Sequence, residues 1–155
     1  MLQRMVARPH AKCIKNLDDI RTIGLIAYAP SQEEMTIISQ FSQAMSTRGC
    51  LVRKLILHAD PTGLDRYGLP KKNAVGDFYD HSYDILIDAT PENNLPGLCV
   101  TLRSRTLLRI AYDDTQLLPN PTKNATYDLI IRGSGSMEMK KYLTDILTIL
   151  KDINK

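Results

Sequence analysis

The feature that most constrains the fold is a short apolar run followed at once by an amphipathic segment. The run Thr22–Tyr28 reads TIGLIAY and holds no charged side chain, as in strands covered on both faces of a parallel sheet. Ser31 precedes Glu34 by three residues, the spacing of a capping box at a helix N-terminus. Apolar residues then recur at helical spacing until Gly49. We therefore expect a strand at 22–28 and a helix at 32–48.

This alternation continues along the chain. The segment Leu51–Leu57 is aliphatic and β-branched, so it completes a strand–helix–strand unit with a right-handed connection. The further predicted elements are a helical turn at 77–81, strands at 83–89, 107–112 and 127–131, a brief helix at 95–103 and a final helix from Met139 to Ile153. The pattern predicts an α/β fold: a three-layer sandwich around a mostly parallel five-stranded sheet, flavodoxin-like or Rossmann-like.

Two connections are irregular. Residues 58–76 hold three glycines and two prolines without periodicity, and loops of this length are often either functional or mobile. The sequence does not decide between these two. No periodic helix is evident between the fourth and fifth strands, so the fifth strand is either parallel through an extended crossover or antiparallel at an edge.

Length and charge favour one domain behind a basic arm. A chain of 155 residues is near the modal size of one domain, and 43% hydrophobic and 24% charged residues argue against disorder. Four basic residues and no acidic ones stand in the first 15 positions: Arg4, Arg8, Lys12 and Lys15. We expect an arm at 1–15 and a single α/β domain at 16–155. The arm is either a loosely docked terminus or a contact for anionic lipid or RNA.

Several features favour a cytoplasmic protein. The longest uncharged stretch, residues 35–47, has 13 residues, whereas a membrane-spanning helix needs about 20. Arg4 and Arg8 interrupt any apolar run that could serve as a secretory signal. Three widely spaced cysteines are present: Cys13, Cys50 and Cys99. Their number and spacing indicate reduced thiols rather than disulfides or a zinc site, and we expect the last two to be buried.

The motifs of common cofactor and catalytic sites are missing from this sequence. In parallel sheets, ligands collect at the carboxyl ends of the strands. The turn after the first strand carries Glu33 and Glu34 at the start of the helix, where they would repel the phosphate of flavin mononucleotide. No Walker loop, G-x-S-x-G motif or metal-type spacing of His and Cys occurs. We expect no catalytic residue, no metal and no cofactor.

The turn after the third strand is one candidate ligand site. It contains Asp88 and Thr90. An aspartate at a strand end with a proline shortly after it, here Pro91, resembles the phosphoacceptor turn of response-regulator receivers. Receivers also need an acidic pair after the first strand, which is absent here, and a lysine where this chain has Arg132. Asp88 could instead hold a hard cation together with Asp113 and Asp114. The alternative is that Asp88 and Thr90 stabilise the turn itself.

The turn after the last strand is the second candidate. It consists of Gly133, Ser134, Gly135 and Ser136. Glycines and hydroxyls before a helix favour anion binding through free N–H groups. The alternative is flexible capping of the final helix, because a G-x-G without a third glycine is a weak signal.

Some segments resemble known families. The segments NLDDIRTIGLIAYAP, SYDILIDATPENNLPGL, YDLIIRG and KKYLTDILTIL together resemble a family of small uncharacterised α/β proteins from Bacteroidetes, over residues 16–154. That resemblance implies no assigned activity and no site residues. YDILIDATPENN followed by RIAYDD is similar to the N-terminal half of heptosyltransferase-type glycosyltransferases. Those enzymes hold the nucleotide sugar mainly in a second domain, which has no counterpart here.

Two functional hypotheses follow. The leading one is a non-catalytic, cytoplasmic α/β module for binding or scaffolding, because the fold pattern is intact and no reactive constellation is complete. The alternative is a nucleotide- or anion-binding enzyme that takes a nucleotide sugar or a phosphorylated metabolite at the strand ends.

Overall fold

A five-stranded sheet forms the centre of the protein. The computed structural model describes residues 17–58 and 63–152. The strands are β1 (Thr22–Tyr28), β2 (Leu51–Leu57), β3 (Ser82–Asp88), β4 (Arg105–Asp114) and β5 (Leu129–Gly133). They pair in the order β2-β1-β3-β4-β5, and every pair is parallel. This order is that of flavodoxin-like sheets, so the predicted α/β sandwich is confirmed and the flavodoxin-like alternative is the one observed.

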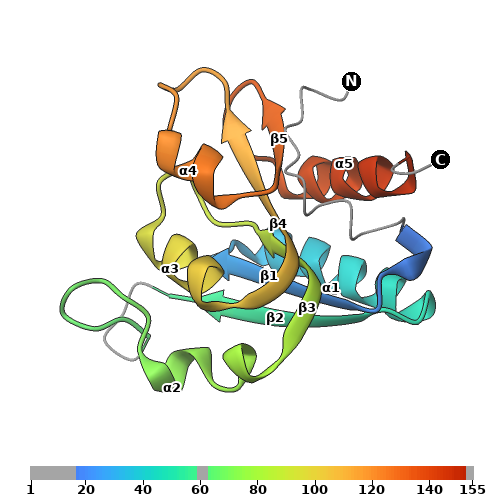
Figure 1. Ribbon diagram of the computed structural model, residues 1–155, viewed down its shortest axis with the longest axis horizontal. Helices are drawn as coiled ribbons and strands as arrows, with labels where there is room; N and C mark the ends of the chain where they lie inside the picture. The colour runs from blue at the N-terminus through green and yellow to red at the C-terminus, as the bar shows by residue number, and fades with distance from the viewer. Residues whose placement is uncertain (1–16, 59–62, 153–155) are drawn as a thin grey trace.

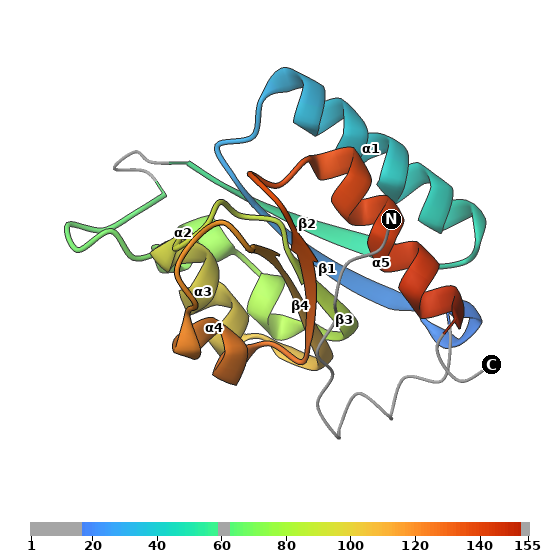
Figure 2. The ribbon, with the colours of Figure 1, turned by 90° about the horizontal axis from the view of Figure 1, so that it is seen from above.

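Helices cover both faces of the sheet. One face carries α1 (Gln32–Thr47) and α5 (Met139–Asp152) (Figure 1). The other face carries α2 (Lys72–Val75), α3 (Leu95–Arg103) and α4 (Pro121–Thr126), as Figure 2 shows from above. Two short 3-10 turns, η2 (Leu17–Asp19) and η3 (Phe78–Asp80), precede β1 and β3. Within the described part of the chain, no helix is long and apolar enough to cross a membrane.

The sheet separates two apolar cores. Successive side chains of a strand point to opposite faces, and the buried residues of β1 and β3 follow this rule. Leu25 and Ile87 pack toward α1 and α5, whereas Ile26 and Leu86 pack toward α2 and α3. Each central strand therefore needs apolar residues at consecutive positions, which explains the unbroken runs in the sequence.

The predicted capping box begins α1. The Glu34 N–H donates to the Ser31 hydroxyl at 3.1 Å, and the Ser31 N–H donates to the Glu34 carboxylate at 2.9 Å. The helix ends before Gly49, whose φ of +82° suits a residue without a Cβ.

The same Tyr-Asp pair occurs at the starts of two strands, and both aspartates accept a main-chain N–H. Tyr83–Asp84 stands at the start of β3, and Tyr127–Asp128 stands just before β5. The Asp84 carboxylate accepts the N–H of Arg21, and the Asp128 carboxylate accepts the N–H of Arg109, each at 2.7 Å. Each aspartate thus ties its strand to the neighbouring strand and helps to set the register.

A helix that the periodicity does not predict lies between β4 and β5. α4 has six residues, too few to show a 3.6-residue pattern. Its local signals are nevertheless present: Asn120 accepts the Lys123 N–H at 3.2 Å, and Pro121 occupies the first turn. With this helix in the crossover, β5 runs parallel to β4, which answers the question that the sequence leaves open.

Other boundaries differ modestly from expectation. β4 continues through Asp113 and Asp114, which pair with β5, and β5 begins two residues later than predicted. The irregular connection at 58–76 contains α2 and an isolated bridge between Leu64 and Pro70. The basic arm, Cys13, residues 59–62 and Ile153 lie outside the described residues.

Candidate functional site

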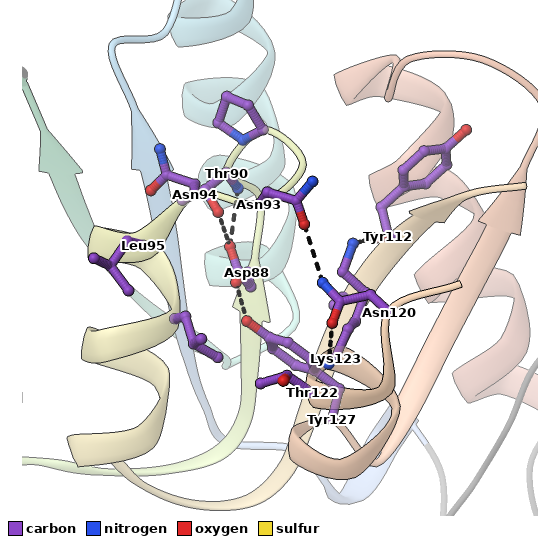
Figure 3. Close-up of a pocket in the computed structure, with 13 residues that line it drawn as sticks. Asp88, Thr90, Asn93, Asn94, Leu95, Tyr112, Asn120, Thr122, Lys123 and Tyr127 are labelled. Carbon is purple, nitrogen blue, oxygen red and sulfur yellow. Dashed lines mark hydrogen bonds between the residues drawn. The ribbon is translucent and has the colours of Figure 1, made fainter. Parts of the chain in front are cut away.

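A pocket of about 240 Å³ lies over the carboxyl ends of β3 and β4, between α3 and α4 (Figure 3). Its lining comes from the end of β3, the β3–α3 loop, the start of α3, the end of β4 and the segment from Asn120 to Tyr127. This is the edge of a parallel sheet at which ligands collect. The turn after β1, which the sequence argues against as a phosphate site, does not line the pocket.

Asp88 forms the floor of the pocket. It is only 7% exposed. One carboxylate oxygen accepts the main-chain N–H of Thr90 at 3.0 Å and also the Thr90 hydroxyl. The other oxygen accepts the hydroxyl of Tyr127. Asp88 and Thr90 therefore stabilise the turn as the sequence suggests, and they also line the pocket.

Burial perturbs both groups of this hydrogen bond. It raises the pKa of the Asp88 carboxyl above its ordinary 3.8, although the hydrogen bonds from Thr90 and Tyr127 oppose the shift. Burial and the neighbouring Asp88 charge raise the pKa of the Tyr127 hydroxyl well above 10. Tyr127 therefore stays neutral and acts as a donor. A buried carboxylate with a raised pKa at a cavity is a feature of functional sites.

The floor is also held from the opposite face of the sheet. Tyr142 of α5 is fully buried, and its hydroxyl donates to the main-chain carbonyl of Asp88 at 2.9 Å. Asp88 is thus bound through its side chain on the pocket face and through its main chain from α5.

A partly buried ion pair ties the loops around the pocket together. Lys123 pairs with Glu92, and the two side chains are 11% and 20% exposed. Lys123 also donates to the Tyr112 carbonyl at 2.8 Å, and Glu92 accepts the Asp114 N–H at 3.0 Å. The lysine charge is therefore balanced inside the site. In Figure 3 the Tyr112 ring points away from the pocket.

Three asparagines stand on the two loops beside the pocket. Asn94 accepts the Gly97 N–H at 2.9 Å and so begins α3. Asn120, the cap of α4, donates to the side-chain oxygen of Asn93 at 3.0 Å, which joins the two loops (Figure 3). Asn93 has a φ of +57°, a conformation that asparagine tolerates better than most residues.

The second predicted turn lies apart from this pocket. Gly133, Ser134, Gly135 and Ser136 are absent from its lining. The Gly135 N–H donates to the Asp114 carboxylate at 2.9 Å, and the Ser134 hydroxyl accepts from Gln116 at 3.0 Å. A carboxylate of the protein thus already occupies an N–H that an anion would need. The structure brings Asp88 and Thr90 together, but not with the glycine turn.

The remaining candidate groups are dispersed. Among the residues that the structure describes, no cluster of three or more His, Cys, Asp or Glu could hold a metal ion. Asp113 lies 3.5 Å from Arg132, whereas Asp114 binds Gly135. Cys50 is buried as expected, whereas Cys99 is only partly buried, contrary to expectation.

Several residues in and beside the pocket cannot be recognised from the sequence. Tyr127 and Lys123 line the pocket and Glu92 lies beside it, and their roles depend on contacts between distant segments. The asparagines left a weak signal: each helix beside the pocket begins with an asparagine followed within two residues by proline.

The fold and the pocket define the class of this protein: a flavodoxin-like α/β domain with a small cavity at the strand ends. A family model described as a family of unknown function (DUF6913) matches residues 1–153. The chain belongs to this family, which confirms the expectation of a family without an assigned function. No curated protein and no solved structure matches the chain.

Proposed function

We propose that this protein is a non-catalytic binding domain that holds a small polar molecule in the pocket between α3 and α4. The observation that carries the proposal is the cavity itself, closed at its base by Asp88 and Tyr127. Its volume of about 240 Å³ is below the ~300–1,000 Å³ typical of pockets for drug-sized ligands. The ligand is therefore small, and the polar lining selects a molecule with hydrogen-bonding groups.

The partners of the ionisable side chains support a binding role over catalysis. Asp88 is bound by Thr90 and Tyr127, and Lys123 is bound by Glu92 and the Tyr112 carbonyl. Of the described residues that line the pocket, none is a serine, cysteine or histidine. The side chains of Asp88 and Lys123 thus stabilise the conformation of the pocket.

The enzyme alternative rests on one observation. The Thr90 hydroxyl donates to the Asp88 carboxylate, which is the arrangement of a nucleophile beside a base. Anion binding has less support, because Gly135 already binds Asp114 and Lys123 is paired with Glu92. Turnover of a phosphorylated metabolite or nucleotide sugar by the purified protein, lost in Thr90→Val, would favour the enzyme.

A fragment titration with a matched pair of variants tests the binding proposal. Leu98 lines the pocket, whereas Leu102 lies one turn further along α3 and is 57% exposed. We expect small polar fragments to shift the amide NMR signals of Thr90 and Thr122 in the wild type and in Leu102→Trp. Leu98→Trp, which fills the pocket, should abolish these shifts. Binding that survives Leu98→Trp, or a library without any such shifts, would contradict the proposal.

The finer expectations from the sequence remain proposals. They are a cytoplasmic location, one domain over residues 16–155, the Bacteroidetes resemblance and the likeness to heptosyltransferases. Contact of the basic arm with anionic lipid or RNA belongs with them. Deletion of residues 1–15 should abolish any salt-sensitive binding to anionic vesicles or RNA while the fold persists, as seen by circular dichroism.

A further inference from the structure

The orientation of the three asparagine amides follows from their partners. A main-chain N–H can only donate, so the Asn94 oxygen must face Gly97 and the Asn120 oxygen must face Lys123. The Asn120 amino group then faces Asn93, whose oxygen must accept the bond. All three side-chain oxygens are thus used within the protein.

The amino groups keep the unused hydrogen-bonding capacity. Among the described residues, nothing accepts a hydrogen bond from the amino groups of Asn93 and Asn94, and Asn120 retains one further N–H. All three asparagines line the pocket. This part of the lining therefore offers donors to a ligand.

The floor of the pocket offers acceptors. Of the described residues, only Tyr127 donates to the second Asp88 oxygen, and a carboxylate oxygen has two acceptor positions. Leu95, Leu98 and Ala111 add an apolar wall. The lining thus combines amide donors, a carboxylate acceptor and a surface for C–H groups.

The charges around the pocket disfavour an ionic ligand. An anion would lie near the carboxylates of Asp88 and Glu92, while Lys123, the only lysine among the described residues of the lining, is paired with Glu92. A cation could use the free acceptor position of Asp88, but it would lie near the Lys123 ammonium group and would face amide donors at the asparagines. An uncharged molecule meets neither difficulty.

We infer that the pocket binds an uncharged molecule with neighbouring hydroxyl groups, such as a single sugar or a comparable polyol. Each hydroxyl both donates and accepts, so adjacent hydroxyls can accept from Asn94 or Asn120 and donate to Asp88. The carbon face of the molecule packs on Leu95 and Leu98. This inference rests on the proposed binding function and names its ligand class.

A titration with a defined panel tests it. Ribose, glucose, N-acetylglucosamine and myo-inositol are compared with the charged compounds ribose 5-phosphate, glucuronate and glucosamine. We expect at least one uncharged compound to bind and to shift the side-chain NH₂ signals of Asn93, Asn94 and Asn120. The charged relative of that compound should bind at least about tenfold more weakly, the change expected from one lost hydrogen bond.

Two variants remove the donors without removing the helix caps. Aspartate caps a helix as well as asparagine does, so Asn94→Asp and Asn120→Asp keep α3 and α4 while replacing the amino group with an acceptor. Each should weaken binding about tenfold or more. Asn73→Asp adds the same charge at an exposed position of α2, away from the lining, and should bind as the wild type does.

The outcomes separate this inference from the proposed function. Charged compounds that bind as tightly, or unchanged affinity in both asparagine variants, would overturn the inference. If no panel compound binds but other fragments bind in a manner blocked by Leu98→Trp, the inference fails and the binding function stands. If nothing binds in a Leu98-dependent manner, both fail.

Discussion

Asp88 receives hydrogen bonds from three separate segments of the chain. Thr90 lies in its own turn, Tyr127 precedes β5, and Tyr142 belongs to α5. The local part could be predicted from the sequence, because an aspartate at a strand end commonly accepts the N–H of the residue two positions later and forms a turn. The two tyrosines could not, since they are 39 and 54 residues away and reach Asp88 only through the tertiary fold.

Removal of the Tyr127 hydroxyl tests its role as a donor to a buried carboxylate. We expect Tyr127→Phe to lower the free energy of unfolding by about 1.5–3 kcal/mol, the range for hydrogen bonds to charged groups. Tyr112→Phe is the matched control, because its hydroxyl donates to the neutral Gly135 carbonyl at 2.9 Å. It should cost about 0.5–1.5 kcal/mol. Urea unfolding at neutral pH measures both, and equal small losses would contradict the assignment.

The raised pKa of Asp88 predicts a pH dependence of stability. Because burial raises the pKa of this carboxyl in the folded state above 3.8, the folded protein binds the proton more tightly than the unfolded chain. The contribution of Asp88 to stability is therefore largest below 3.8 and decreases as the pH rises through the folded-state pKa. Asp88→Asn should remove this decrease. Urea unfolding across a pH series measures it, and parallel curves for both proteins would exclude the shift.

At the scale of elements, α3 packs unusually close to the turn that carries Thr90. A Cβ on Gly97 would lie 2.5 Å from the Thr90 hydroxyl oxygen and 2.7 Å from its methyl carbon. Only glycine permits this approach, which brings the first turn of α3 to the wall of the pocket.

Gly97→Ala should therefore destabilise the protein although alanine favours helices. Alanine is better than glycine by up to about 1 kcal/mol in a helix, but overpacking costs about 1–3 kcal/mol. We expect a net loss of about 1–2 kcal/mol. In a Thr90→Ala background the same substitution should cost less, because the hydroxyl oxygen and the methyl carbon are gone and only the Cβ of residue 90, at 3.0 Å, remains close. A double-mutant cycle by urea unfolding measures this, and additive effects would refute the explanation.

Elements differed in how well the sequence predicted them. The capping box at Ser31 and the apolar run of β1 are local signals, and the observed starts of α1 and β1 agree with the predicted ones. α4 does not follow from the apolar pattern, because six residues cannot show periodicity, although Asn120 and Pro121 mark its start. Local cap chemistry was thus a better guide to short helices than the apolar pattern.

At the scale of the whole molecule, the pocket follows from strand order and handedness. The chain passes from β1 to β2 in one direction across the sheet and then from β2 through β3 and β4 to β5 in the other. Right-handed crossovers place α1 on one face and α2, α3 and α4 on the opposite face. α3 and α4 are therefore neighbours over β4, and the pocket opens between them. The class of fold could be predicted from the alternation, but the strand order could not, because parallel strands pair with distant segments.

Burial predicts how stability is distributed. Leu25, Ile26, Leu86 and Ile87 in the central strands are 0% exposed, whereas α4 has no buried residue. We expect the amides of β1 and β3 to exchange with solvent only on global unfolding, and those of α4 to exchange by local opening. Hydrogen exchange followed by NMR measures this order. Equal protection of α4 and β3 would contradict it.

The hydrogen bond from Tyr142 links the far helical layer to the ligand-facing one. The hydroxyl of Tyr142 in α5 donates to the main-chain carbonyl of Asp88, and the side chain of Asp88 lines the cavity. Any macromolecule that displaced α5 would therefore break this hydrogen bond to Asp88. A molecule bound in the cavity would in turn stabilise the packing of α5 on the sheet. We therefore expect the packing of α5 and the occupancy of the cavity to be coupled through the Asp88 carbonyl.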